Sequence, residues 1–216
     1  MTRIPFTWAK NDASVREAYC EQFLREHPHS AVHAILYEDV PEIREALERM
    51  RVRQNLPKAD TSKISAYTDF IWNDAGQGHQ MNIYVTSAGF KRTAHSLHDA
   101  IHIHEYQHAA DHKDGINLHD GTRIDWRNAR LLRPALRSIL LETRAYSKDI
   151  LSHINEDSPA IRQYTSDAVG ILDEFIDALC EIKPDNDLEQ TVMVYCAGTI
   201  NSTFERDLRH HNTEEL

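Results

Sequence analysis

The stretch His104-Glu105-Tyr106-Gln107-His108 constrains this chain most, because it sets two histidines four residues apart within a run of helical character. Residues four apart project from the same side of an α-helix, so His104 and His108 direct their imidazoles toward a common point. Two neutral imidazole nitrogens held in this way provide half of a tetrahedral zinc site. Glu105 lies about 100° around the helix axis from His104. There it is better placed to hold a metal-bound water, as a general base, than to bind the metal.

Apolar residues around the motif favour a helix packed in the interior over a solvated, histidine-rich helix. Leu97 and Ile101, with Ala94, extend the histidine side of the helix, and the opposite side is apolar too. A helix that is apolar on both sides of its axis is expected to be buried. Gly115 is expected to end it, since glycine readily takes the left-handed conformation that closes a helix.

The motif resembles the active-site helix of the zincin metallopeptidases, a superfamily with H-E-x-x-H on a helix. In the gluzincin-like group the third zinc ligand is a glutamate on a later helix, often with alanine three residues after it. Glu142 and Ala145 match that pattern in this chain. The local sequences HEYQHAAD, DWRN and ETRA are also similar to a peptidase family of the mitochondrial inner membrane that processes an ATP-synthase subunit. The resemblance covers about 50 residues around the site, and it implies zinc-dependent peptide hydrolysis.

A third protein ligand is expected, because catalytic zinc sites combine three protein ligands with an open water position. Glu142 follows the apolar run Ile139-Leu140-Leu141, where a carboxylate is expected to be paired or metal-bound. The alternative for Glu142 is a solvent-facing helix residue paired with Arg144 or Arg137. Other third-ligand candidates are Asp114, at the spacing of the metzincin ligand, then His112 and, more weakly, His119. The metzincin pattern would place its glycine at Asp111, and Met193 is interpreted as a core residue rather than a methionine turn.

Two further residues are candidates for supporting roles at this site. Asp111 is a possible hydrogen-bond partner for a zinc-bound histidine, and its alternative is a solvated acid at the helix end. Tyr146 lies one turn after Glu142 and is a possible donor to an oxyanion, although a core position suits it better. Tyr195 and His153 are weaker candidates for that role.

The order of patterned segments predicts an α+β fold. By resemblance it is zincin-like, with a small, mostly antiparallel sheet packed on the motif helix and a helical C-terminal lobe. A single domain is expected over residues 1–216, with an upper lobe of about 1–115 and a helical lobe of about 116–216. Strands are predicted at Ser30–Val40, Ile64–Trp72 and Met81–Thr86, with a turn at Asn73–Gly78 and a loop at Ile116–Arg127. Helices are predicted at Ala13–Glu26, from Pro41 to about Leu56, across the motif, from Pro134 to about Ile154, at Pro159–Ile182 and at Leu188–Leu208.

Charge and composition limit the partners of the chain. A net charge of −10 argues against sequence-independent binding to nucleic acid or anionic membranes. No stretch is long enough for a membrane span, and MTRIPFTWAK at the N-terminus lacks the apolar core of a secretory signal. Three widely separated cysteines suggest neither a disulfide framework nor a cysteine zinc site. We expect a cytoplasmic protein, or one delivered or secreted without a cleaved signal peptide.

These observations lead to one main hypothesis and two alternatives. The main hypothesis is a zinc metallopeptidase, an endopeptidase whose protein or peptide substrate pairs with Met81–Thr86, which by resemblance is the zincin edge strand. The absence of an evident inhibitory segment would suit an effector or toxin protease of narrow specificity. The first alternative is a catalytically inactive zincin-like protein that binds a partner, and the second is an enzyme that hydrolyses a non-peptide amide.

Overall fold

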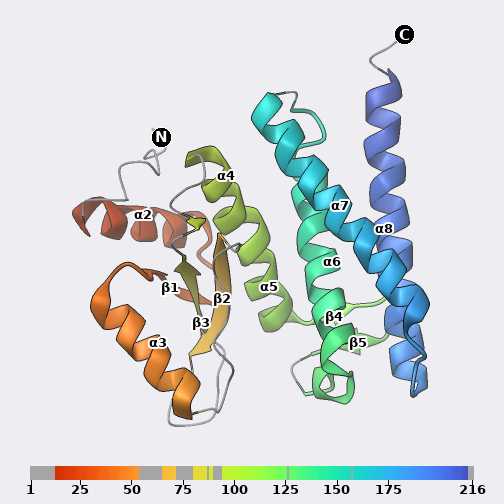
Figure 1. The fold of residues 1–216 in the computed structure, drawn as a ribbon, viewed down its shortest axis with the longest axis horizontal. Coiled ribbons are helices and arrows are strands. Elements are labelled where there is room, and N and C mark those ends of the chain that lie inside the picture. Colours follow the sequence, from red (N-terminus) through yellow and green to blue (C-terminus); the bar gives the residue numbers. More distant parts are fainter. Residues whose placement is uncertain are drawn as a thin grey trace. The chain divides into compact units, whose positions relative to one another are not determined.

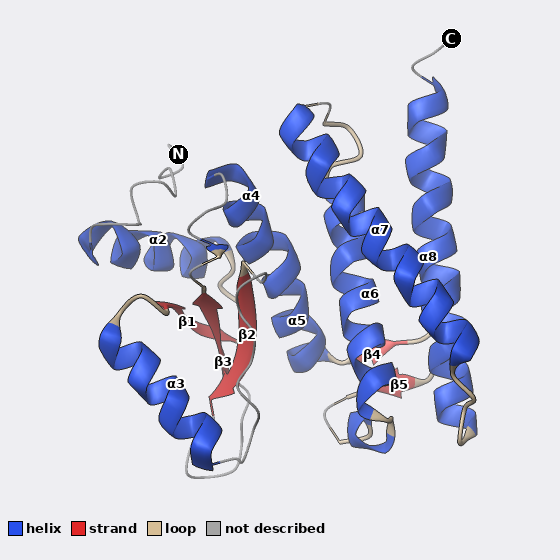
Figure 2. Cartoon of the chain, in the orientation of Figure 1, coloured by secondary structure: helices blue, strands red, loops and turns tan. Residues whose placement is uncertain are grey.

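The computed structural model describes residues 13–53, 65–71, 80–86, 88–89, 94–125, 127–156 and 158–213. The chain divides into two compact units, Met1–Ala109 and Ala110–Leu216, which are described one at a time. Helices predominate, and the strands form two small sheets (Figure 2). This agrees with the predicted α+β class. The N-terminal segment MTRIPFTWAK and the predicted turn Asn73–Gly78 lie outside the described residues.

The N-terminal unit combines a three-stranded sheet with helices (Figure 1). The elements, in chain order, are α2 (Ala13–Glu26), β1 (Val32–Tyr37), α3 (Pro41–Arg53), β2 (Ala66–Ile71), β3 (Gln80–Val85), α4 (Ala94–Asp99), the π-helical segment η2 (Ala100–Glu105) and the beginning of α5 (Tyr106–Asp114), whose residues from Ala110 on belong to the C-terminal unit. α4, η2 and α5 follow one another without a break, and we call them together the motif helix. The predicted strands and helices of this half are therefore present, with ends shifted by a few residues.

The strand order β1-β3-β2 corrects one prediction. β3, which contains most of Met81–Thr86, is the central strand, pairing in parallel with β1 and antiparallel with β2. Because its backbone groups bond strands on both sides, β3 is not an edge strand to which a peptide could add. The antiparallel pairing expected of a hairpin is confirmed for β2 and β3. The sheet is mixed, however, and not mostly antiparallel.

The core of the N-terminal unit lies between the sheet, α2 and the motif helix. In β3 Met81, Ile83 and Val85 are buried as predicted, but Tyr84 and Thr86 are buried as well, so the strand is covered on both faces and its burial does not alternate. In β1 the pairing register shifts between Val32 and Ala34. An irregularity of this kind reverses the side to which later residues point. The buried residues of the strand are Val32 before the shift and Ile35 and Tyr37 after it. The cluster includes Tyr19 and Phe23 of α2 and Leu97, Ile101 and Ala109 of the motif helix.

The C-terminal unit is built from three long helices, α6 (Pro134–Ser152), α7 (Pro159–Glu181) and α8 (Asp187–Thr213) (Figure 1). Proline occupies the first turn of both α6 and α7, where its missing N–H has no partner to lose. The Ser158 side chain caps α7 by accepting a hydrogen bond from the Ile161 N–H at 3.3 Å. Although Thr191–Tyr195 has strand propensity, it lies within α8, because helix packing overrides local preference.

Two apolar clusters hold this unit together. One joins α6, α7 and α8 to the short strands β4 (Ile116–Asn117) and β5 (Arg123–Ile124), and the other lies between α6, α7 and α8. β4 and β5 pair antiparallel within the stretch predicted to be a loop, which is a small correction. Gly115, immediately before β4, has a φ of 71° and ends α5 as expected. A short 3-10 turn, η3 (Ala129–Leu131), precedes α6.

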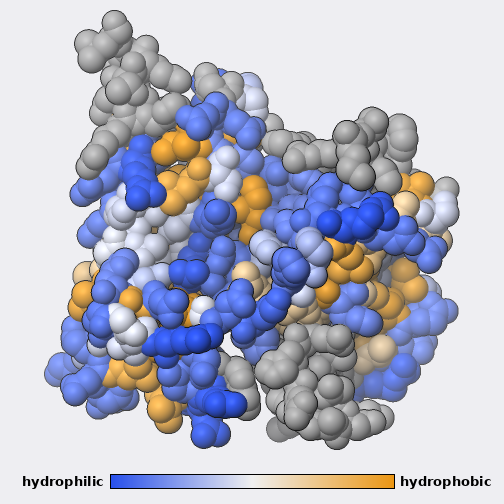
Figure 3. Space-filling view, turned by 180° about the vertical axis from the view of Figure 1, so that it is seen from behind, coloured by the Kyte–Doolittle hydropathy of each residue, from blue (hydrophilic) through white to orange (hydrophobic). Residues whose placement is uncertain are grey.

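Hydrophilic side chains cover much of the surface seen in Figure 3, with smaller apolar areas between them. Leu131, Val194 and Leu208 are the large apolar side chains that are more than half exposed among the described residues. Within those residues, none of the helices combines the length and apolar character needed to cross a membrane. Cys20, Cys180 and Cys196 are free thiols, in line with the prediction that no disulfide framework exists.

Candidate metal centre

The motif lies where a π-helical segment passes into an α-helix. His104 and Glu105 are the last two residues of η2, and His108 is in α5. The Tyr106 N–H bonds the Ile101 carbonyl five residues earlier, which is the π-helical pattern. The sequence predicted an uninterrupted α-helix here, because π-helical turns have no clear sequence signal. Such turns are rare in proteins as a whole, and those that occur are often found at functional sites.

His104 and His108 direct their rings toward each other. Their Nε2 atoms lie 3.3 Å apart, and the rings meet edge to face with an interplanar angle of 83°. Two nitrogens bound to one tetrahedral zinc at the usual bond length are separated by about 3.3–3.4 Å. The same distance also permits a hydrogen bond when one ring carries its proton on Nε2. The pair therefore has the spacing that zinc requires before any side chain moves.

Glu105 is the buried carboxylate of the motif, with 4% of its surface exposed. It lies on the same buried side of the helix as Leu97, Ile101 and Ala109, and the two histidines are half-buried beside it. The Thr68 hydroxyl, from β2, donates to Glu105 Oε2 at 2.6 Å. Among the described residues no arginine, lysine or histidine forms an ion pair with Glu105. Thr68 is a functional candidate that the sequence did not reveal, because nothing local links β2 to a glutamate on a distant helix.

Glu142 belongs to the C-terminal unit, whereas the two histidines belong to the N-terminal unit. It is half-buried in α6, next to the fully buried Thr143. Arg144, which could have paired with Glu142 in the alternative interpretation, instead binds Asp111. Glu142 as the third ligand stays a prediction.

The other third-ligand candidates have different settings. Asp114 is exposed at the end of α5, His112 is half-buried in the same helix, and His119 is exposed, with its ring centroid 4.7 Å from that of Tyr195. Met193 lies in α8, partly buried against the apolar cluster of the C-terminal unit. Its expected core role is confirmed, and a helix leaves no room for a methionine turn.

Asp111 is buried and ion-paired, so the interpretation as a solvated acid at the helix end is wrong. Its Oδ2 accepts a hydrogen bond from Arg144 Nε at 2.8 Å, and Arg144 Nη1 donates to the Tyr195 hydroxyl at 2.6 Å. Burial alone would lower the pKa of the Arg144 guanidinium, but the hydrogen bond and charge of Asp111 raise it above its usual value. This network ties the end of α5 to α6 and α8. Whether Asp111 also orients a histidine stays a prediction.

Tyr146 packs against an apolar cluster of the C-terminal unit, with its ring centroid 6.4 Å from that of Phe175. This packing accounts for the position of the ring, and the suggested contact of its hydroxyl with an oxyanion stays a prediction. Of the weaker candidates, Tyr195 is engaged by Arg144 and His153 is buried.

Comparison of the chain with protein-family models, with curated proteins and with solved structures gave no match. The functional argument therefore depends on the motif and on the geometry described above.

Proposed function

We propose that the protein is a zinc-dependent metallopeptidase in which His104 and His108 bind the metal and Glu105 is the general base. The observation that carries the proposal is the 3.3 Å separation of the two Nε2 atoms next to a buried glutamate. Two imidazoles at that spacing suit one zinc ion. A buried carboxylate without a cationic partner among the described side chains is costly for stability and is typical of a functional group.

Each residue has a defined task in this proposal. Zinc, when bound, acts as a Lewis acid and makes water acidic enough to lose a proton near neutral pH. Glu105 takes that proton and later delivers it to the leaving amine. Thr68 holds the Glu105 carboxylate through the hydrogen bond to Oε2, so that the base keeps one orientation.

Glu142 is our proposal for the third ligand. Its support is the glutamate and alanine pattern with Ala145, its half-buried position in α6, and the ion pair of the neighbouring Arg144 with Asp111. Asp111 lies in α5, less than one turn beyond His108, and Arg144 lies two residues beyond Glu142. Within the C-terminal unit the ion pair joins Asp111 of α5 to the part of α6 that contains Glu142.

A peptide or an unfolded protein segment is the substrate class that fits best. Since β3 is central, we assign the substrate-pairing role to β2, which pairs with β3 on one side and is the last strand on its side of the described sheet. β2 also contains Thr68, which bonds the proposed base. A peptide added to this edge would lie next to Glu105, and main-chain hydrogen bonds would hold it whatever its sequence.

The test is cleavage of a proteome-derived peptide library by the zinc-loaded protein, with mass spectrometry of the new termini. We expect Glu105→Gln to lower cleavage by about 10²–10⁴-fold, as for removal of a general base, while its zinc content stays unchanged. Glu174→Gln, an exposed substitution of the same kind in α7, is the matched control. Full cleavage by Glu105→Gln would refute the mechanism, and zinc binding without any cleavage by the unaltered protein would favour the partner-binding alternative.

The third ligand has its own test. We expect Glu142→Ala to lose zinc, and Asp114→Ala and His112→Ala to retain it. If Glu142→Ala binds as much zinc as the unaltered protein, Glu142 is not a ligand, and the roles of His104, His108 and Glu105 still depend on the first test.

A further inference from the structure

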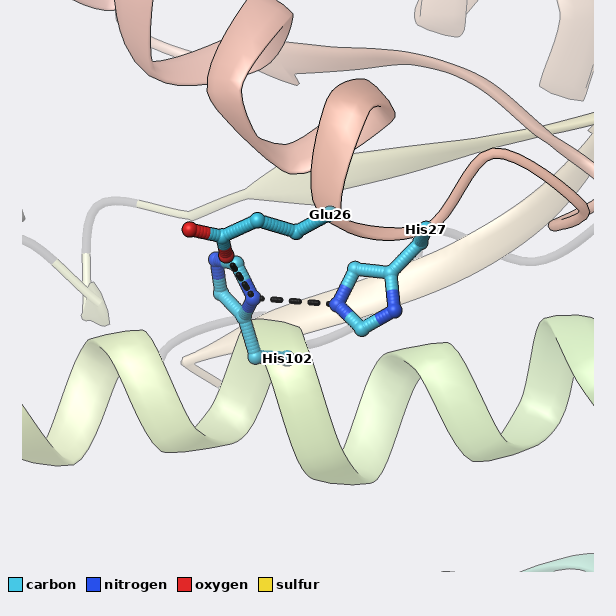
Figure 4. Close-up of side chains that lie close together, drawn as sticks. All are labelled: Glu26, His27 and His102. Atoms are coloured by element: carbon cyan, nitrogen blue, oxygen red, sulfur yellow. Dashed lines mark hydrogen bonds and ion pairs between the residues drawn. The ribbon is translucent and has the colours of Figure 1, made fainter. Parts of the chain in front are cut away.

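A second group of metal-binding side chains lies in the N-terminal unit, separate from the His104 and His108 pair. Glu26 is the last residue of α2, His27 follows it, and His102 is in η2 (Figure 4). In Figure 4 the Glu26 side chain extends sideways from the end of α2, with one carboxylate oxygen toward His102. The His27 ring points toward His102, which points up from the motif helix. Each offers one ligand atom, and these three atoms all lie within 4.8 Å of one another.

The distances fit a single ion. His27 Nε2 lies 3.1 Å from His102 Nδ1, and Glu26 Oε2 lies 3.6 Å from the same His102 nitrogen. Ligand atoms on one tetrahedral zinc are about 3.3–3.4 Å apart, so the two measured separations fall on either side of that value. Small rotations of side chains would bring all three atoms to bonding distance of one ion.

The surroundings hold the two imidazoles in place. The Phe23 ring lies 4.7 Å from His27 and 4.9 Å from His102, centroid to centroid, and the Tyr106 ring lies 4.2 Å from His27. The His102 side chain is only 9% exposed, whereas that of Glu26 is 35% exposed. A ligand pair that is fixed by packing loses little conformational freedom when it binds an ion, and the exposed glutamate gives the ion a path of entry.

We propose that Glu26, His27 and His102 form a second metal site, for zinc or a similar divalent transition metal. Two imidazole nitrogens and a carboxylate oxygen are the donors that these ions prefer over magnesium or calcium. The site lies beyond the peptidase function, because its ligand atoms form a group separate from that of His104 and His108. Its ion would fasten the end of α2 to the π-helical segment that leads into the catalytic motif, so its role is structural.

The site is separate from the catalytic one for a geometric reason. His102 and His104 are two residues apart and project to different sides of the helix. His102 contacts Phe23 and His27, whereas His104 contacts His108. Each site therefore loses its metal independently, and this independence makes the proposal testable.

The experiment measures zinc per chain in the full-length protein, stripped of metal, reloaded with Zn²⁺ alone and passed through a desalting column. We expect two zinc ions per chain in the unaltered protein and one in His27→Ala. We also expect one in the double variant His104→Ala, His108→Ala. His29→Ala, an exposed histidine two residues from His27, is the matched control and should keep two.

The outcomes separate the two proposals. If His27→Ala binds as much zinc as the unaltered protein, the cluster is only a hydrogen-bonded histidine pair, the second site is refuted, and the catalytic centre is unaffected. If the double variant His104→Ala, His108→Ala binds as much zinc as the unaltered protein, the peptidase proposal is refuted, and the second site is not.

A second pair of variants covers the case in which His27→Ala does not fold. Glu26→Gln removes the negative charge of one ligand from an exposed side chain. It should weaken the zinc affinity of the second site by at least about 10-fold. Glu21→Gln, exposed in the same helix, should not. Zinc should also raise the melting temperature of the double variant His104→Ala, His108→Ala, and Glu26→Gln added to it should reduce that rise. Equal zinc affinity in Glu26→Gln and Glu21→Gln would refute the site.

Discussion

Three buried carboxylates, two in the C-terminal unit and one in the N-terminal unit, have different partners. In the C-terminal unit Asp111 and Glu189 are 5% and 2% exposed, and each is paired with an arginine, Arg144 and Arg133 respectively. In the N-terminal unit Glu105 is 4% exposed, and its partner is the neutral hydroxyl of Thr68. Desolvating a carboxylate is costly unless a cation or several hydrogen bonds compensate for it. Asp111 and Glu189 receive that compensation from side chains of their own unit.

This difference distinguishes acidic residues with a structural role from one with a proposed catalytic role. Asp111 and Glu189 connect elements of a helical scaffold, and each accepts hydrogen bonds from the arginine with which it is paired. Glu105 lies beside a histidine pair instead, and in our account the compensating positive charge comes from zinc. A group kept in a costly state is expected at an active site, where stability is given up for function. The following predictions test this contrast in order of decreasing effect.

Removing a zinc ligand should have the largest effect. Structural zinc binding contributes about 10–16 kcal/mol, so losing one of three protein ligands should weaken affinity by about 1000-fold. We expect His108→Ala to show this loss in a competition titration with a chromophoric chelator. His119→Ala, exposed in the C-terminal unit, is the control. Unchanged affinity in His108→Ala would show that the zinc is bound elsewhere.

Breaking a structural ion pair should have the next largest effect. Asp111→Asn leaves the partly buried Arg144 without its anion, and the free energy of unfolding should fall by about 3 kcal/mol. Denaturant titration measures the change, and Asp114→Asn at the exposed end of α5 should alter it by less than about 0.5 kcal/mol. Equal stability of the two variants would mean that the Arg144 pairing is not structural.

Altering the support of the base should have a smaller effect. Thr68→Val removes the hydroxyl that holds Glu105 but keeps the shape of the side chain, and kcat should fall by about 10-fold with little change in KM. Thr68→Ser, which keeps the hydroxyl, should restore kcat. An equal loss of kcat in Thr68→Ser would contradict the positioning role.

The pH dependence of Glu189 should be the smallest effect, because the Arg133 side chain is 30% exposed and partly screened by solvent. Hydrogen bonds from Arg133 and from backbone N–H groups lower the pKa of Glu189 from 4.5 to about 2. A lowered folded-state pKa means that its stabilisation is present above pH 4.5 and is lost as the pH falls toward 2. We expect Glu189→Gln to melt at a lower temperature than the unaltered protein at pH 7 and to differ less from it at pH 3. A difference independent of pH would contradict this assignment.

Local patterns predicted much of this molecule. Periodic apolar residues and prolines identified the helices from Pro134 and Pro159 onward, and alternation identified the strand around Ile83. The spacing of His104 and His108 predicted their convergence. All of these signals lie within one element, where geometry follows directly from residue spacing.

The errors and omissions concern contacts between distant segments. The central position of β3 depends on which strands pair with it. The apolar pattern of Met81–Thr86 is compatible with an edge strand and with a central strand, so it does not distinguish the two. The hydrogen bond of Thr68 to Glu105, the ion pair of Asp111 with Arg144 and the meeting of His27 with His102 each join segments far apart in the chain. The π-helical turn at η2 had no local signal, and it affects which side chains share a face.

The most direct test of the central claim is to measure the thermal stability of metal-free Glu105→Gln and the peptide cleavage by the same variant loaded with zinc. Our account predicts a melting temperature equal to or above that of the metal-free unaltered protein, because a buried carboxylate without a cationic partner among the described side chains is removed, together with a loss of cleavage. A lower melting temperature with cleavage intact would show that Glu105 is a structural acid like Asp111 and Glu189, and it would contradict the account.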